Sequence, residues 1–292
     1  FTVTLIADAL FWLLSFTPLL PKFSFCCRWL NWGNLALSLL FAAGALYAGV
    51  KVPVVKNVHI PSERLAREYT VVVLSDLHIH RVINPQKIER IVSLANARNP
   101  DVVLLAGDII DDDVRRVSKI TALLKGLKAS KGIYFVTGNH EFYAGYDETV
   151  RELANLGFMF LENDGAAVGE DLYLAGVPDT FAGAAYGKTP DLNRAFAKAG
   201  KGAFRLLVSH TPSDFAGRDF DLEVSGHTHG GQIFPFHIFA KLHNKYLSGL
   251  YPMPGGAEIY VSNGAGQWGP QMRFLAPSEI TVLKLTPEKQ EK

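Results

Sequence analysis

Cysteine and net charge are both scarce in this sequence. The 292 residues include two cysteines, the adjacent Cys26 and Cys27, so no disulfide framework supports the long segment that follows them. The formal net charge is only +1. Because domains that bind nucleic acid usually carry a clear basic excess, we expect no nucleic-acid partner.

Charged residues are also almost missing from the first 50 positions. The stretch from Phe1 to Pro21 contains one, Asp8, and the stretch from Trp29 to Val50 contains none. About 20 mostly apolar residues suffice to cross a bilayer, so we predict two transmembrane helices in residues 1–50 and the lipid bilayer as a partner. A buried helical hairpin of a soluble protein is the alternative interpretation.

A different pattern begins near Thr70, where short β-branched runs alternate with amphipathic stretches. This alternation predicts an α/β fold with a largely parallel sheet in its first half, and the strand-rich second half predicts a second, mixed sheet. We expect a linker at 51–69, one domain at 70–286 and a tail at 287–292. The predicted helices are 85–98, 114–128 and 147–156, and the predicted strands are 69–74, 101–106, 133–136, 158–161, 172–175, 204–209, 222–225, 258–262 and 280–285.

Two histidines, His227 and His229, lie one residue apart in a glycine-framed stretch. Histidine is the commonest metal ligand, and residues i and i+2 of an extended segment point the same way. Both rings can therefore face one point. The pair is weak on its own, since an ordinary polar loop has the same composition.

Polar residues follow five of the predicted strands at the point where each strand ends. They are Asp76 and His78, Asp108, Asn139 and His140, His210, and His227 and His229. Because ligands collect at the carboxyl ends of strands in open α/β sheets, we expect one site. Carboxylate, imidazole and amide groups without sulfur suit Mn, Fe or Zn. Two such ions about 3.5–4 Å apart can clamp the attacking and leaving oxygens of a phosphoryl displacement.

These motifs resemble the calcineurin-like metallophosphoesterase family, which reads D-x-H, G-D, G-N-H-E, S-H and G-H-x-H. The run 226–236 resembles the membrane-attached, YkuE-like branch of that family. The resemblance implies a metallophosphoesterase fold, a two-sheet β-sandwich flanked by helices, preceded by transmembrane helices. It also implies a place in a membrane, with the bacterial cytoplasmic membrane favoured and the side of the catalytic domain left open.

The resemblance implies a role for each polar residue. The ligands are Asp76, His78 and His229 for a first divalent metal ion, Asn139, His210 and His227 for a second, and Asp108 between the two. His140 would stabilise or protonate the leaving oxygen, and a metal-bound hydroxide would attack phosphorus. Glu141 stands where many relatives have Asp and is expected to orient His140.

Other residues have both a functional and a plain interpretation. His80 is expected either to touch substrate or to lie in a surface turn. The run 111–113 is acidic and precedes a predicted helix, so we interpret it as favouring the positive end of that helix rather than as a metal site. Phe142, Tyr143 and Trp268 suit a substrate pocket and ordinary packing equally well.

The stretch from Ile233 to Tyr251 follows the paired histidines directly and mixes apolar residues with lysines. It shows no clean period, so we predict a loop or short helix beside the site. Apolar groups rimmed by cations suit an amphipathic ligand or the bilayer surface, and a loop folded onto its own core is the alternative.

These features predict a membrane-anchored phosphoesterase that uses two divalent metal ions. Its substrate would be a phosphodiester, phosphomonoester or pyrophosphate, with a lipid-linked phosphoester favoured. The alternative is a catalytically weak, membrane-bound scaffold that retains the fold as a binding module. Intact motifs, including His140, argue against that alternative.

Overall fold

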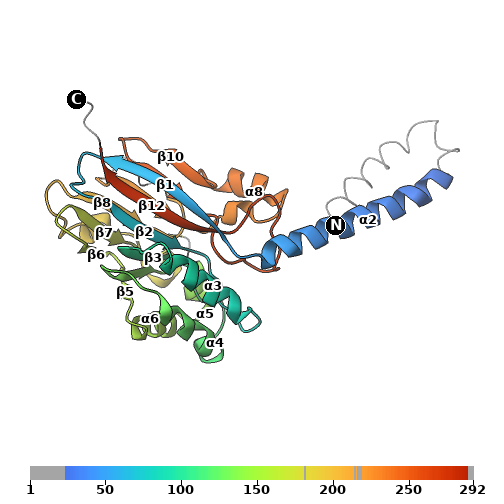
Figure 1. The fold of residues 1–292 in the computed structure, drawn as a ribbon, viewed down its shortest axis with the longest axis horizontal. Coiled ribbons are helices and arrows are strands. Elements are labelled where there is room, and N and C mark those ends of the chain that lie inside the picture. The colour runs from blue at the N-terminus through green and yellow to red at the C-terminus, as the bar shows by residue number, and fades with distance from the viewer. Residues whose placement is uncertain (1–23, 181, 214, 216–218, 289–292) are drawn as a thin grey trace.

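The computed structural model describes residues 24–180, 182–213, 215 and 219–288, with side chains from residue 32 onward. Two six-stranded sheets pack into one domain, and a long helix, α2, projects from it (Figure 1). The first predicted span, from Phe1 to Pro21, and most of the predicted tail lie outside the described residues.

The first sheet has the strand order β1-β12-β2-β3-β4-β5. Its bounds are β1 Val54–Ser62, β2 Tyr69–Leu74, β3 Val102–Ala106, β4 Ile133–Val136, β5 Met159–Phe160 and β12 Glu279–Pro287. Strands β2 to β5 are parallel, and β12 runs antiparallel to β2. Every residue of β2 and β3 is buried, which accounts for their continuous apolar runs, because strands covered on both faces show no alternation.

The second sheet has the strand order β10-β11-β9-β8-β7-β6. Its bounds are β6 Asp164–Ala167, β7 Leu172–Gly176, β8 Phe204–Val208, β9 Leu222–Ser225, β10 Gly249–Pro252 and β11 Glu258–Val261. The four central strands are parallel, whereas β6 and β10 run antiparallel to their neighbours. The predicted fold class, a sandwich of two sheets flanked by helices, is confirmed.

The residues of β2 show how the layers pack. Val71 and Val73 share a buried cluster with Leu206 of the second sheet. Val72, between them, packs in a different cluster with Ile88 of a covering helix. Successive strand residues point to opposite faces, so this single strand contributes to the core between the sheets and to the core under the helices.

The helices begin where the sequence supplies caps. Their bounds are α2 Ser24–Val50, α3 Pro85–Asn96, α4 Val114–Thr121, α5 Asn139–Ala144, α6 Tyr146–Asn155, α7 Leu192–Ala195 and α8 Phe236–His243. The Asn84 side chain accepts a hydrogen bond from the N–H of Gln86 at the start of α3, and Asp113 does the same for Arg115 in α4. Helix α4 ends seven residues before the predicted boundary, because a tighter 3₁₀ segment, Ala122–Gly126, replaces its last turns.

The segment expected to be a linker contains a strand. Residues Val54–Ser62 form β1, which pairs in parallel with β12 along its full length. The strand lies at the sheet edge and only Ile60 in it is buried, so it lacks the apolar run that marks the other strands. Its hydrogen-bonding partner also lies at the far end of the chain, where no local pattern signals the pairing.

Helix α2 is long and apolar enough to cross a membrane over residues 32–50, and about a tenth of that stretch is buried. Its last turns contact the domain. The ring of Phe41 meets that of Phe274 edge-on, and the carbonyl of Ala45 accepts a hydrogen bond from the N–H of Arg273. The carbonyl of Gly49 accepts hydrogen bonds from Lys87 and Gln267. The helix therefore ends against α3 and the segment before β12.

Candidate metal centre

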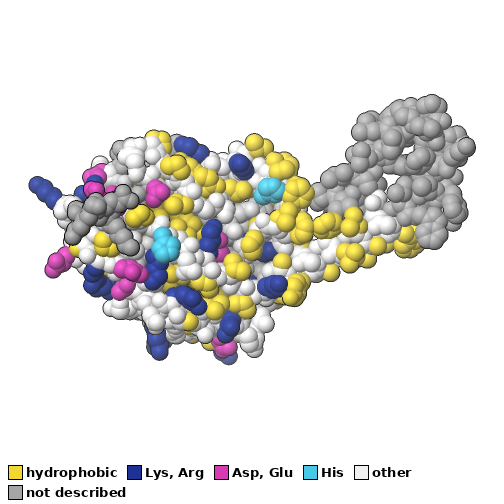
Figure 2. Space-filling model, turned by 45° about the horizontal axis from the view of Figure 1, so that its top comes forward, with side chains coloured by type: hydrophobic (Ala, Val, Ile, Leu, Met, Phe, Trp, Pro, Cys, Tyr) yellow, Lys and Arg dark blue, Asp and Glu magenta, His cyan; other side chains and the backbone are white. Residues whose placement is uncertain are grey.

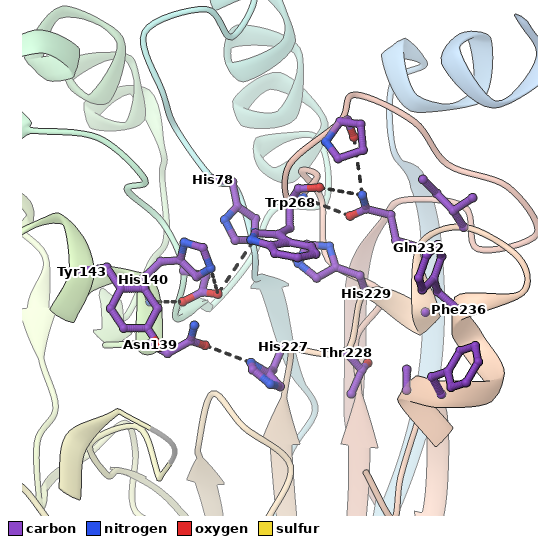
Figure 3. Close-up of a pocket in the computed structure, with 16 residues that line it drawn as sticks. His78, Asn139, His140, Tyr143, His227, Thr228, His229, Gln232, Phe236 and Trp268 are labelled. Carbon is purple, nitrogen blue, oxygen red and sulfur yellow. Dashed lines mark hydrogen bonds and ion pairs between the residues drawn. The ribbon is translucent and has the colours of Figure 1, made fainter. Parts of the chain in front are cut away.

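The predicted site residues meet at one edge of the sandwich. Strands β2, β3 and β4 of the first sheet and β8 and β9 of the second all end there. The next few residues after these strands carry the predicted polar side chains, Asp76, His78, Asp108, Asn139, His140, His210, His227 and His229. The structure therefore brings these side chains together, and Figure 3 shows His78, Asn139, His140, His227 and His229 among them.

The backbone at this edge is unusual. In the described part of the chain, nine residues other than glycine have positive φ, and five of them are candidate ligands: Asp76, His78, Asp108, His227 and His229. Residues with side chains rarely adopt this left-handed conformation, and such strain concentrates at functional sites. The folded structure therefore stabilises five unfavourable backbone conformations, and these orient the five side chains toward the same site.

The first group consists of Asp76, His78 and His229, whose ligand atoms lie within 4.8 Å of one another. The Nε2 atoms of the two histidines are 2.9 Å apart, and Nε2 of His229 is 3.4 Å from Oδ1 of Asp76. Oδ2 of Asp76 is buried and has no hydrogen-bond partner. A divalent cation would satisfy this orphaned oxygen and the two facing nitrogens at once.

The second group consists of Asp108, His210 and His227. A backbone carbonyl can only accept, so Nδ1–H of His210 donates to the carbonyl of Ala106 at 2.9 Å. This bond leaves the buried Nε2 of His210 as the free nitrogen, 3.1 Å from Oδ2 of Asp108. Asn139 joins the group through its Oδ1, which lies 3.0 Å from Nδ1 of His227.

Asp108 connects the two groups. Its Oδ2 lies 3.8 Å from Nε2 of His78 and 3.1 Å from Nε2 of His210. Burial raises the pKa of Asp108, but the charges of His210, His78 and His140 outweigh it, so the net pKa is far below the usual range. Burial, His78 and Arg273 together hold the pKa of His229 well below its usual value. Asp108 is therefore held ionised and His229 neutral, which are the forms in which these side chains bind a divalent metal ion.

The comparison with known families agrees with this donor set. The sequence profile described as "Calcineurin-like phosphoesterase" matches residues 69–231. The chain belongs to this family. The match runs from the start of β2 through the paired histidines, and it covers every candidate ligand.

Individual relatives support the same assignment. A metallophosphoesterase of Helicobacter pylori is 37% identical over 88% of this chain and 70% of its own length. A zebrafish (Danio rerio) protein named "Transmembrane protein with metallophosphoesterase domain" is 34% identical over 86% of this chain and 61% of its own. The metallophosphoesterase YkuE of Bacillus subtilis is 31% identical over 74% of this chain and 79% of its own. Metallophosphoesterases are phosphoric ester hydrolases, so the predicted enzyme class is confirmed.

Within this metallophosphoesterase, Asp111 contacts His140, the histidine that the sequence predicts to act on the leaving oxygen. Its Oδ1 forms a short ion pair with Nδ1 of His140 and lies 3.0 Å from Nδ1 of His78. Burial lowers the pKa of His140, but Asp111 and Asp108 outweigh it and the net direction is upward. The sequence predicts that Asp111 favours the start of the helix together with its acidic neighbours, whereas the residue that caps α4 is Asp113. The signal that it lies at the site is its position three residues after Asp108 in the same loop.

Glu141 does not orient His140, contrary to expectation. Its buried carboxylate turns the other way and accepts four backbone hydrogen bonds, from the N–H groups of Asp108, Ile109, Ile110 and Gly138 at 2.6–3.0 Å. These donors lie in the two loops that carry Asp108 and Asn139. The longer arm of glutamate, compared with aspartate, lets one side chain reach both loops and fix their spacing.

Arg273 contacts a candidate ligand, and the sequence does not predict this role. Its side chain is fully buried, and burial lowers its pKa to about 10. It donates hydrogen bonds to the carbonyls of His229, Gly264 and Gly266, and its guanidinium lies 3.2 Å from Nδ1 of His229. The arginine therefore fixes the backbone and the ring of one candidate ligand. No local motif marks it, because its partners come from three separate loops.

A cavity of about 730 Å³ opens beside the metal centre (Figure 3). Tyr143 and Trp268 line it, as one interpretation of the sequence expected, whereas Phe142 is buried against Tyr146 instead. The rest of its wall away from the ligands comes mainly from α8 and the turn before it: Gly231, Gln232, Ile233, Phe236, Phe239 and Ala240. The stretch 233–251 is therefore a short helix beside the site followed by β10. His80 is half-buried and does not line this cavity.

Proposed function

We propose that this protein hydrolyses a phosphoester with the help of two divalent metal ions. Asp76, His78 and His229 would hold one ion, Asn139, His210 and His227 would hold the other, and Asp108 lies between the two groups. The observation that carries the proposal is the position of Asp108: its carboxylate belongs to one ligand group and also lies close to His78 of the other. When bound, the metals supply an activated water and neutralise charge on the phosphate.

The remaining chemistry belongs to the chain. His140 stands at the rim of both groups, with Nε2 3.9 Å from Oδ2 of Asp108 and its side chain about one sixth exposed. It can therefore meet a substrate oxygen that enters from the cavity. Asp111 holds the Nδ1 side of the ring and favours the protonated form, so Nε2–H is set to donate to the leaving oxygen.

The substrate proposed here carries an apolar group next to its phosphate. Phe236, Phe239 and Trp268 all line the cavity, and these residues are about 60% exposed. A small, fully charged phosphoester offers nothing for these rings to contact, whereas an acyl or prenyl chain does. A lipid-linked phosphoester fits both the metal centre and this wall.

Membrane attachment through α2 is part of the same proposal. The apolar stretch of α2 leaves the domain at residue 50 and is mostly exposed, which is costly in water but expected in lipid. The zebrafish relative is named as a transmembrane protein. An anchored domain would hold the cavity near the bilayer that supplies a lipid-linked substrate.

The test uses the full chain in detergent. We expect hydrolysis of bis(p-nitrophenyl) phosphate to disappear after chelation and to return with Mn²⁺ or Zn²⁺. Asp108→Asn should lower the metal content and abolish turnover, whereas Asp112→Asn, a nearby aspartate outside the ligand groups, should preserve both. Full activity in a metal-free preparation would refute the metal mechanism. Metal binding without hydrolysis of any phosphoester would support the scaffold alternative instead.

A further inference from the structure

Helix α8 presents apolar residues on two different sides. Phe236, Phe239 and Ala240 line the cavity, and their spacing of three and four residues places them on one side of the helix. Ile238 and Leu242, four residues apart, share another side and do not line the cavity. The substrate proposed above accounts for the first side only.

The second side is exposed in the domain. None of the eight residues of α8, all of which the structure describes, is buried. The side chain of Ile238 is 47% exposed and that of Leu242 is 80% exposed. Single exposed apolar residues are ordinary, but a helix whose most buried residues, His237 and Ala240, are only half-buried gains little from packing on its own domain. A second apolar medium would therefore add to its stability.

The neighbourhood of α8 identifies that medium. The N–H of Phe234, two residues before α8, donates to the carbonyl of Phe274, whose ring packs on Phe41 of α2. The adjacent Leu275 is 74% exposed. Figure 2 shows hydrophobic side chains gathered at the end of the domain from which α2 leaves. An apolar surface thus continues from the membrane-spanning stretch to α8.

Charge around α8 fits a lipid surface as well. Lys241 flanks the side that carries Ile238 and Leu242, and His243 ends the helix. Long cationic side chains can lay their stems on apolar surface while the charged ends stay in the headgroup region. Short helices with apolar residues beside lysines are typical of segments that lie in the membrane interface.

We propose that α8 lies in the surface of the bilayer that α2 spans, with Ile238 and Leu242 in the boundary between headgroups and acyl chains. The cavity lies on the other side of the same helix and would then open close to the lipid phase. In this position, a lipid-linked substrate could reach the metal centre without crossing water. This consequence rests on the proposed function.

Spin labels measure the depth of α8 without relying on catalysis. In a background with Cys26→Ser and Cys27→Ser, Leu242→Cys is labelled in the full chain, reconstituted into mixed phosphatidylcholine and phosphatidylglycerol nanodiscs. Met159→Cys is the matched control, an exposed apolar position on β5, the far edge strand of the first sheet. We expect oxygen to reach the Leu242 label better than a polar nickel reagent does, and the reverse at position 159.

Three results would overturn the proposal. Equal access of the nickel reagent to both labels would place α8 in water. Exclusion of both reagents from the Leu242 label would place α8 against its own domain. Dipolar broadening that disappears on dilution with unlabelled protein would assign the surface to a second copy of the chain.

Kinetics then test the consequence. The double variant Ile238→Ser with Leu242→Ser should lower turnover of a vesicle-borne phosphoester by about tenfold or more, because two side chains lose their burial in lipid. It should leave hydrolysis of bis(p-nitrophenyl) phosphate unchanged, since neither residue lines the cavity. Equal loss on both substrates contradicts a membrane role. Absence of all hydrolysis in the parent protein would reject the proposed function while the label depths still decide the position of α8.

Discussion

The substitution Glu141→Gln tests whether one buried carboxylate fixes the two loops that carry Asp108 and Asn139. Glutamine has nearly the same shape, so it introduces no cavity. Each carboxylate oxygen accepts two backbone hydrogen bonds: Oε1 from Ile109 and Ile110, and Oε2 from Asp108 and Gly138. Whichever oxygen becomes the amide nitrogen, two buried N–H groups lose their acceptor and face another donor.

The magnitude follows from that count. A buried donor left without a partner costs about 1–3 kcal/mol, so two of them cost about 2–6 kcal/mol. A domain of this size loses roughly 2–4 °C in Tm per kcal/mol, which corresponds to a fall of about 4–24 °C. Because Asp108 moves with its loop, we also expect the metal content to fall.

Thermal unfolding of the full chain in detergent, followed by circular dichroism, gives the first quantity, and elemental analysis gives the second. Glu148→Gln is the matched control, since Glu148 is an exposed glutamate on the neighbouring helix α6. Its Tm should stay within about 1 °C of the parent value, as surface substitutions usually do. A Glu141→Gln variant that keeps its Tm and its metals would show that these hydrogen bonds do not fix the two loops.

Three further predictions concern the proton donor and the domain boundary. Asp111→Asn removes the partner that raises the pKa of His140, so the ring should lose its proton at lower pH. The alkaline limb of the kcat profile should therefore move to lower pH, whereas the control Asp112→Asn should leave it in place. His140→Ala should keep both metals and cut kcat by about 10²–10⁴-fold, the usual size of a general-acid contribution, and a fall in metal stoichiometry would contradict its assigned role. A chain that starts at Val58 removes the first half of β1, so its Tm should lie well below that of a chain that starts at Lys51, and equal values would show that this half of β1 does not stabilise the domain.

The sequence predicted the parts of this molecule that depend on local pattern. Strands β2 and β3 are continuous apolar runs, and α3 has a cap, a first-turn proline and a regular apolar face. The candidate ligand residues follow strand ends, and the carboxyl ends of neighbouring parallel strands lie at the same edge of a sheet. Strand β1 escaped prediction because its stabilising partner, β12, lies at the other end of the chain.

The supporting residues of the site were less predictable for the same reason. Asp111 and Asp113 look alike in sequence, yet one contacts His140 and the other caps α4. Arg273 forms hydrogen bonds with groups that come from distant segments, and only the folded chain brings them within reach.

The segment that carries Arg273 connects α2 to the candidate metal centre. Its backbone N–H donates to the carbonyl of Ala45 in α2, while its guanidinium contacts His229, a candidate ligand. A transmembrane helix tilts to match the thickness of the hydrocarbon layer around it. In the proposed anchored state, such a tilt would act through one residue on a metal ligand. Bilayer thickness, and not only the presence of a bilayer, would then set the rate of hydrolysis, and the same chain would work at different speeds in membranes of different composition.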